Sequence, residues 1–142
     1  MGKLGCSMFA AFAASGNSVF GYDINKYTRQ KLNDKIAPVS ETDLQKELDI
    51  GFDNYQILDN TSDVIEKSEV IYVIVPTPSL EDGTFDVQYL EQVLNGINDV
   101  KKDCGNKLLV ITSTVLPGDT RSKLISLVKN KKNNFSKIKF CY

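Results

Sequence analysis

The chain has 142 residues, of which 42% are hydrophobic and 25% charged, and its formal net charge is −1. This length is enough for one domain with a single core, and the weak net charge gives no reason to expect nucleic acid or an anionic membrane as a partner. The sequence shows neither an apolar run as long as a membrane span nor the pattern of a signal peptide. We therefore expect a cytoplasmic protein with no membrane partner.

The cysteine and histidine content limits the possible chemistry. The three cysteines (Cys6, Cys104 and Cys141) are odd in number and widely separated, which is typical of reduced thiols and not of a disulfide framework or a metal site. We expect all three to be buried packing residues. Because the chain has no histidine, it lacks the commonest general base and the commonest metal ligand.

The first half of the chain opens with the pattern helix, turn, strand and acid. Small and apolar residues from 4 to 14 predict a helix that packs closely on a sheet and ends at 15–17. Residues 18–22 predict a short strand with Asp23 at its carboxyl end. The elements expected next are a helix at 26–33, a short helix capped within 40–43 and running through Leu48, a strand at 55–58, and a helical turn at 61–67 capped by Thr61 or Ser62.

Two continuous apolar runs mark the second half. Residues 70–75 and 107–111 are rich in β-branched side chains and show no alternation, as expected of strands buried on both faces of a parallel sheet. The other expected elements are helices at 85–102 and 119–129, a solvated loop at 130–137 and a last strand at 138–142. Strands that alternate with helices predict an α/β fold with a doubly wound, mostly parallel sheet of Rossmann-like type.

The glycines at the start of the chain indicate a dinucleotide site. Gly2 and Gly5 have the spacing of the second and third glycines of the G-x-G-x-x-G/A fingerprint, and Asp23 lies 18 residues after Gly5. An acid near this distance accepts hydrogen bonds from the adenosine ribose, and it favours NAD because it repels the 2′-phosphate of NADP. We interpret Lys26 and Arg29 as part of the solvated face of the next helix. The alternative to a dinucleotide site is that Gly2 and Gly5 are a chance pair of glycines at an ordinary helix start.

Polar and rigid residues follow both diagnostic strands. Pro76, Thr77 and Pro78 come after the first, and Ser113 and Thr114 come after the second. Ligands of an open α/β sheet bind outside the carboxyl ends of its strands. We therefore expect Thr77 and Thr114 to line one crevice together with the glycine loop. The alternative is that both segments are ordinary strand-to-helix loops, which Pro and Gly punctuate everywhere.

Three segments of the chain resemble the N-terminal domain of the UDP-glucose/GDP-mannose dehydrogenase family: VIVPTPSLEDGTFDVQYLEQV, with STVLPGDTRSKL downstream and FGYDIN upstream. The resemblance implies a cytosolic enzyme, homodimeric when full length, that oxidises the C6 alcohol of a nucleotide sugar to a carboxylate with two NAD in succession. The implied cofactor-binding residues are those of the glycine loop, the acid and the two strand-end loops, namely Gly2, Lys3, Leu4, Gly5, Asp23, Ile24, Pro76, Thr77, Pro78, Ser113 and Thr114.

The chain also departs from the family pattern at several positions. The family usually begins with a strand before its first glycine, has a basic residue where this chain has Thr28, and reads Glu-Pro-Gly-Leu where this chain has 41–44. The family's catalytic Cys, Lys and Asp lie beyond Tyr142. We therefore expect no catalytic residue in 1–142 and interpret the chain as an NAD-binding domain truncated at both ends. With the central first strand absent, we expect the isolated chain to fold poorly.

Other classes of protein remain open at this point. The chain could be a non-catalytic nucleotide-binding remnant, or a module that binds a partner. A β-hydroxyacid-type dehydrogenase shares the plan of the first domain, but the Pro-Thr-Pro loop with its following glycine argues against it. Within the family, UDP-glucose, UDP-N-acetylmannosamine and GDP-mannose are all possible substrates.

Overall fold

The computed structural model describes residues 1–98, 100, 106–118, 124–125 and 139–141. The chain divides into two compact units, Met1–Lys67 and Ser68–Tyr142. All strand pairings between the named strands are parallel: β1 with β2 in the first unit, and β3, β4 and β5 in that order in the second. Among the described helices, none is long and apolar enough to cross a membrane.

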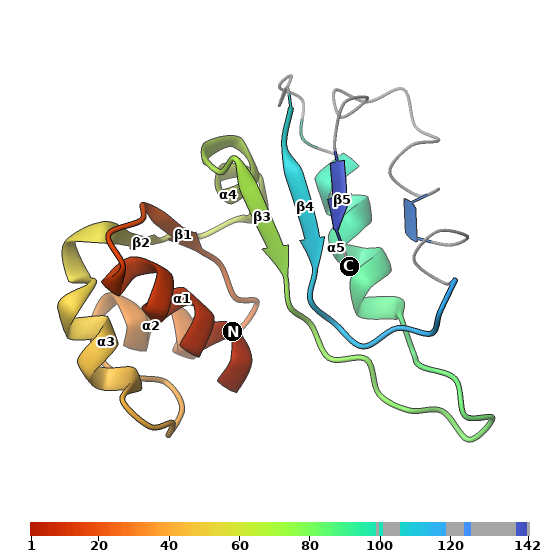
Figure 1. Ribbon diagram of the computed structural model, residues 1–142, viewed down its shortest axis with the longest axis horizontal. Coiled ribbons are helices and arrows are strands. Elements are labelled where there is room, and N and C mark those ends of the chain that lie inside the picture. Colours follow the sequence, from red (N-terminus) through yellow and green to blue (C-terminus); the bar gives the residue numbers. More distant parts are fainter. Residues whose placement is uncertain (99, 101–105, 119–123, 126–138, 142) are drawn as a thin grey trace. The chain divides into compact units, whose positions relative to one another are not determined.

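The first unit is a two-stranded parallel sheet with helices around it (Figure 1). Its elements, in chain order, are α1 (Lys3–Ala14), β1 (Val19–Gly21), α2 (Lys26–Asn33), α3 (Leu44–Ile50), the short 3-10 helix Phe52–Asn54, β2 (Tyr55–Ile57) and α4 (Thr61–Lys67). These bounds agree with the predicted ones to within one to four residues, and those of α2 agree at both ends. In the sheet, Val19 pairs with Tyr55 and Gly21 with Ile57.

The core of the first unit lies between α1, α2 and α3. Cys6, Phe9 and Ala10 of α1 are buried together with Leu32 of α2 and with two leucines of α3, Leu44 and Leu48. The small residues of α1 allow close packing, as the sequence predicted. At Gly51 a Cβ would lie 2.6 Å from the backbone carbon of Ala13, so only glycine fits between α1 and the end of α3.

Helix ends in this unit follow standard chemistry with two departures from the predictions. α1 ends in a Schellman motif at Gly16, whose φ is 85°: the amide of Asn17 donates to the carbonyl of Phe12, and the amide of Gly16 donates to that of Ala13. The predicted cap of α4 was wrong, because Asn60 and not Thr61 or Ser62 accepts from the amide of Asp63. Asp43 occupies the N-cap position of α3 in a left-handed conformation with φ 58° and makes no side-chain cap.

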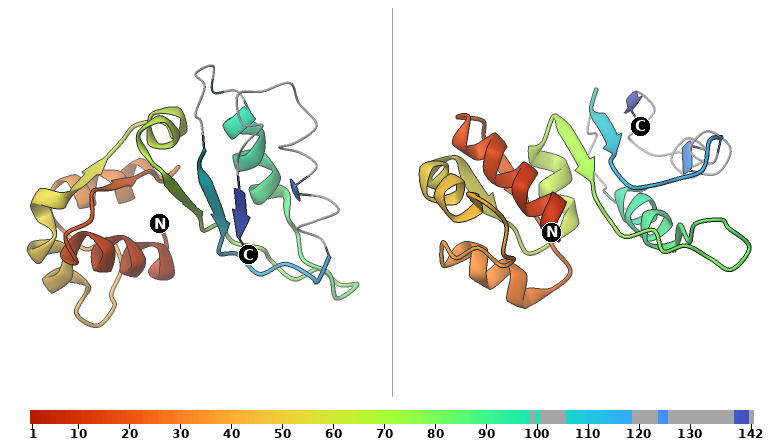
Figure 2. Two further views of the ribbon diagram at one scale, coloured as in Figure 1. Left: turned by 45° about the horizontal axis from the view of Figure 1, so that its top comes forward. Right: turned by 60° about the horizontal axis from the view of Figure 1, so that its bottom comes forward.

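The second unit has a three-stranded sheet in the order β3 (Val70–Val73), β4 (Leu108–Ile111) and β5 (Lys139–Cys141). Figure 2 shows α5 (Gln88–Asn98) along one face of this sheet. Of the five apolar residues whose spacing predicted this helix, Leu90, Leu94 and Ile97 are buried, and Val87 and Val93 are half-buried. β4 is central and pairs on both sides, with Leu108 opposite Val70 and Lys139.

Burial in β3 corrects one prediction. Ile71 and Val73 are buried, but Val70 and Tyr72 are each 43% exposed, so this strand is not buried on both faces. A continuous apolar run cannot tell the two situations apart, since it has no polar residue to mark the exposed face. Cys141 is exposed, also against expectation, whereas Cys6 is buried as predicted. Cys104, the loop predicted at 130–137 and most of the helix predicted at 119–129 lie outside the described residues.

The architecture confirms the predicted class. The chain is an α/β fold of Rossmann-like type with parallel sheets. The segment that joins β1 to β2 contains α2 and α3, and the segment that joins β3 to β4 contains α5. The segment between β4 and β5 lies partly outside the described residues. The carboxyl ends of β1 and β2 meet at one edge of their sheet, and those of β3 and β4 meet at one edge of theirs. These edges carry the residues that the sequence singled out.

Candidate functional site

The backbone amides at the N-terminus of α1 have no side-chain cap. Gly2 is the N-cap residue of this helix. The first amides of a helix have no partner within the helix, and the helix dipole adds positive potential there, so this end attracts anions such as phosphate. A Cβ on Gly2 would have nothing within 4 Å, so the space beside this N-cap residue is open.

Asp23 lies beside this helix end. The amino group of Met1, the residue before Gly2, forms an ion pair with Oδ2 of Asp23. Oδ1 of the same carboxylate accepts a hydrogen bond of 2.7 Å from the backbone amide of Asn25. The Met1 side chain also lies against Gly5 and Gly21, at 3.5 and 3.0 Å from the position of a Cβ on each. The structure thus brings the glycine loop and the acid together, 18 residues apart in the chain.

Charged and apolar residues border this arrangement. Lys3 Nζ pairs with Glu41 Oε1 at 2.8 Å, and this hydrogen bond raises the pKa of the exposed Lys3 ammonium. Ile24, next to Asp23, is 85% exposed and offers an apolar surface at the same strand end. Leu4 is 52% exposed on the first turn of α1.

The segment 41–44 contains a residue in the left-handed backbone conformation. Its third residue, Asp43, stands where the family pattern has glycine, and its φ of 58° is the left-handed conformation that glycine adopts most easily. Aspartate is among the few other residues that tolerate this region. Aspartate at position 43 is therefore compatible with this backbone conformation.

The interpretation of Arg29 as a solvated residue was wrong. Lys26 is exposed as expected, but Arg29 is only 9% exposed. Its Nη1 donates to the carbonyl of Asp23 at 2.7 Å and to that of Ile24 at 3.3 Å. The helical spacing of α2 could have given this signal, because Arg29 and the buried Leu32 are three positions apart on one face.

In the second unit, the loops after β3 and β4 leave the same edge of the sheet. Ser113 connects them, because its hydroxyl donates to the carbonyl of Val75 at 2.7 Å and accepts from the amide of Val75 at 3.0 Å. The Ser113 hydroxyl is therefore engaged within the protein. Thr77 is half-buried and Thr114 is exposed.

The loop after Pro78 forms a small hairpin that the sequence analysis missed. The amide of Leu80 donates to the carbonyl of Thr84, and the amide of Asp86 donates to that of Pro78. Asp82 Oδ1 accepts from the hydroxyl and the amide of Thr84, and Gly83 follows Asp82 with φ 81°. An Asp-Gly pair is a strong turn signal and could have predicted this hairpin.

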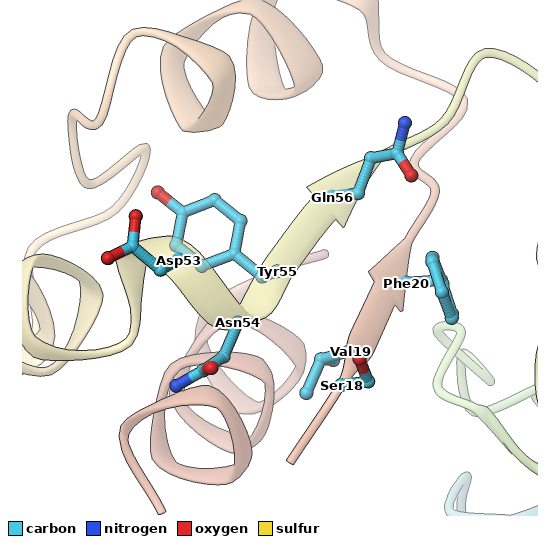
Figure 3. Close-up of a pocket in the computed structure, with 7 residues that line it drawn as sticks. All are labelled: Ser18, Val19, Phe20, Asp53, Asn54, Tyr55 and Gln56. Carbon is cyan, nitrogen blue, oxygen red and sulfur yellow. The ribbon is translucent and has the colours of Figure 1, made fainter. Parts of the chain in front are cut away.

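A separate cavity of about 350 Å³ lies at the amino ends of β1 and β2 (Figure 3). Its lining residues are Ser18, Val19, Phe20, Asp53, Asn54, Tyr55 and Gln56. Asn54 Nδ2 is used in a 2.9 Å bond to the carbonyl of Ala13, and Gln56 Oε1 accepts from Lys67 Nζ at 3.4 Å. This cavity is at the strand edge opposite Asp23 and contributes no residue to the candidate site. Within the described part of the chain, no cluster of His, Cys, Asp and Glu has the grouping of a metal site.

An α/β domain with a glycine-started helix beside an acidic strand end defines a dinucleotide-binding protein. The chain belongs to the UDP-glucose/GDP-mannose dehydrogenase family, and residues 1–141 match the NAD binding domain of that family. Its cofactor is NAD. The site fits this cofactor, since it offers free helix amides for a pyrophosphate and a carboxylate for a ribose, with open space at Gly2.

The relatives of this chain are named after different nucleotide-sugar substrates. The chain is 28% identical over 133 residues to a GDP-mannose 6-dehydrogenase of Pseudomonas putida, covering 92% of this chain and 30% of that protein. It is 31% identical over 132 residues to a UDP-N-acetyl-D-mannosamine dehydrogenase of Pyrococcus horikoshii, with the same coverage of 92% and 30%. A UDP-glucose 6-dehydrogenase of Rickettsia felis is 30% identical over 124 residues, covering 85% and 27%. The chain thus spans about a third of these relatives.

Solved structures show the same fold. A ternary complex of GDP-mannose dehydrogenase from Pseudomonas aeruginosa matches with a TM-score of 0.88 at 24% identity, over 98% of this chain and 33% of that one. A UDP-N-acetyl-mannosamine dehydrogenase from Pyrococcus horikoshii matches with a TM-score of 0.81 at 26% identity, over 98% and 33%.

Proposed function

We propose that this chain is the NAD-binding part of a nucleotide-sugar 6-dehydrogenase, which oxidises the C6 alcohol of a sugar to a carboxylate with two NAD in succession. The family and its cofactor are the starting point. The observation that carries the proposal is the contact of the α1 start with Asp23, because it joins the two halves of a dinucleotide fingerprint. The relatives include GDP-mannose, UDP-glucose and UDP-N-acetylmannosamine dehydrogenases, and a nucleotide sugar is the substrate class they share.

Each candidate residue then has a role. The amides at Lys3, Leu4 and Gly5 bind the pyrophosphate, and the carboxylate of Asp23 accepts hydrogen bonds from the adenosine ribose. Ribose hydroxyls would replace the Met1 amino group at Oδ2, while Oδ1 stays with the amide of Asn25. Ile24 packs against the adenosine. NAD supplies the hydride acceptor.

The second unit supplies the remaining cofactor contacts in this proposal. Pro76, Thr77, Pro78 and Thr114 border the nicotinamide half, and Ser113 keeps their two loops in register through its bonds to Val75. The thiolate that traps the aldehyde formed by the first oxidation belongs to a segment beyond Tyr142. The full-length enzyme is a homodimer.

Two experiments test the proposal. The full-length gene product, supplied with NAD and a panel of UDP-glucose, GDP-mannose and UDP-N-acetylmannosamine, should form two NADH for each sugar consumed. One NADH per sugar would contradict the two-step oxidation, and NAD binding without turnover on any sugar would favour a non-catalytic remnant.

The role of Asp23 is tested by binding. Calorimetric titration should give tighter binding of NAD than of NADP, and Asp23→Ala should weaken NAD binding by about 1–3 kcal/mol, as expected for losing a hydrogen bond to a charged group. Equal affinities for NAD and NADP in the unaltered chain would contradict the role given to this carboxylate. Asp53→Ala is a matched control, because it removes an exposed carboxylate at the other end of the strands.

A further inference from the structure

Arg29 is buried on a helix that is otherwise mostly polar and exposed. Only Arg29 and Leu32 are buried among the eight residues of α2, all of which are described. Its neighbours Lys26 and Gln30 are exposed. Burying a guanidinium is costly unless its donors find partners, so a buried arginine at this position calls for a specific explanation.

The partners of Arg29 are concentrated on one turn. Nη1 donates to the carbonyls of Asp23 and Ile24, and the guanidinium carbon lies 5.5 Å from the ring centroid of Tyr22. Three consecutive residues, 22–24, are therefore in contact with one side chain. These residues directly follow the end of β1 and include the acid, Asp23.

The rest of the guanidinium faces the end of β2. Arg29 Nε has no hydrogen bond within the described residues, and its nearest acid is Asp59, whose Oδ1 lies 3.6 Å away. Asp59 follows the end of β2 by two residues, and its side chain is 96% exposed. This ion pair is long and open to solvent, so it compensates little for the buried charge. The two backbone carbonyls are the main partners.

Those carbonyls determine how the carboxylate of Asp23 is presented. The Asp23 side chain leaves the same residue whose carbonyl Arg29 binds, and its Oδ1 is bonded to the amide of Asn25 one residue after Ile24. Arg29 and this local hydrogen bond thus hold the backbone that directly follows the acid. Without Arg29, two carbonyls in a partly buried turn would lack their donor and the turn would rearrange.

We propose that Arg29 is a positioning residue for Asp23: by binding the carbonyls of Asp23 and Ile24 it orients the carboxylate toward the ribose, and so it sustains the preference for NAD over NADP. The inference rests on the proposed role of Asp23. An arginine near such an acid is a usual feature of NADP sites, but Nη1 of Arg29 donates to the backbone and is not directed to a 2′-phosphate.

A double-mutant cycle in the full-length gene product tests this, with NAD and NADP affinities measured by calorimetry. Arg29→Met should weaken NAD binding about tenfold, the scale of one hydrogen bond to a charged group, and should weaken NADP binding less. The ratio of the two affinities therefore falls. In an Asp23→Asn background, the same Arg29→Met change should alter NAD affinity by less than about twofold, since there is no carboxylate left to position.

A control variant tests whether the loss of a positive charge alone changes the affinity ratio. Lys26→Met removes one positive charge from the same helix at an exposed site, and it should leave the affinity ratio unchanged. Equal tenfold losses of NAD affinity in both backgrounds would overturn the inference and assign Arg29 a merely structural role. Failure of the unaltered chain to prefer NAD would instead overturn the proposed function. Should Arg29→Met not fold by circular dichroism, Arg29→Lys, which keeps the charge but lacks the planar fork, carries the same cycle.

Discussion

At the scale of single residues, Gly2 and Gly16 show that two glycines of one segment have different reasons to be glycine. Gly2 has an ordinary backbone conformation, with φ −77°, and open space around it. Gly16 also has open space, but its φ of 85° is strained for any other residue. Backbone conformation explains the second glycine, and under the proposed function space for the cofactor explains the first.

This difference predicts opposite phenotypes. Gly2→Ala should leave the free energy of unfolding within about 0.5 kcal/mol of the unaltered chain but weaken NAD binding at least about tenfold, because the methyl group occupies the approach of the pyrophosphate. Gly16→Ala should destabilise the chain by about 1 kcal/mol and leave NAD affinity unchanged. Urea denaturation and calorimetric titration measure the two effects. A Gly2→Ala variant with full NAD affinity would remove Gly2 from the site.

Cys6 is a free and buried thiol. It is fully buried in α1, and its Sγ donates to the carbonyl of Met1 at 3.2 Å. Burial raises the pKa of this thiol. The reactive species is the thiolate, so Cys6 should be inert in the folded protein.

The prediction is slow labelling and a loss of stability at high pH. In a variant with Cys104 and Cys141 replaced by serine, Cys6 should react with a maleimide at least about 100-fold more slowly than after unfolding in urea. Because the unfolded thiol releases its proton first, the unfolded state binds fewer protons and stability falls as the pH rises above about 8.5. Rapid labelling of the folded chain would contradict the packing role.

At the scale of elements, the paired loops after β3 and β4 depend on one hydroxyl. Ser113 satisfies both the amide and the carbonyl of Val75, which the ladder of β3 and β4 does not pair because it ends at Val73 and Ile111. The strand-end loop of Pro76 to Pro78 begins at the next residue. Ser113 is therefore the anchor from which this loop starts.

Removing this hydroxyl should loosen the loop. Ser113→Ala should cost about 1–2 kcal/mol of stability, because a half-buried amide and carbonyl lose their partner. The amide of Val75 should exchange its hydrogen faster, while the amides of β4 remain protected. Hydrogen exchange followed by NMR distinguishes the two. Ser79→Ala, at an exposed loop position, should change neither quantity, and unchanged exchange at Val75 in Ser113→Ala would refute the anchoring role.

At the scale of the whole molecule, the described strands form two sheets, and the chain divides into two compact units. β1 pairs only with β2 among the described strands, and each of these strands has three residues. β4 pairs with a neighbour on each side. Two-stranded sheets of this length are marginal without helix packing, whereas a central strand is protected on both edges.

The two units should therefore open separately. Native-state hydrogen exchange should give the amides of β4 the largest opening free energy, with those of β1 and β2 exchanging earlier through a distinct opening. Increasing urea at low concentration should shift the two groups with different slopes. A single opening free energy shared by both sheets would show one cooperative domain and would refute this division.

Much of the fold could be predicted because it depends on local patterns. The spacing of apolar residues predicted the helix α5 and its three buried side chains among five candidates, and the run before Pro76 predicted β3. The same run misjudged Val70 and Tyr72, because a run without polar residues carries no information on which face is covered. The cap of α4 was misassigned by one or two residues, which is the usual uncertainty where several polar residues adjoin.

The sequence by itself determined the α/β class, the order of the elements and the pairing of glycine loop with acid, because these follow from periodicity, turn chemistry and the spacing of Gly2, Gly5 and Asp23. The family was indicated by the resemblance of three motif segments. Only the tertiary structure decided that Arg29 is buried against the turn of the acid and that the Ser113 hydroxyl binds Val75. The physical reason is that these facts are contacts between residues on different elements. A side chain's own surroundings in the chain do not determine which backbone group, up to 38 positions away, will satisfy it.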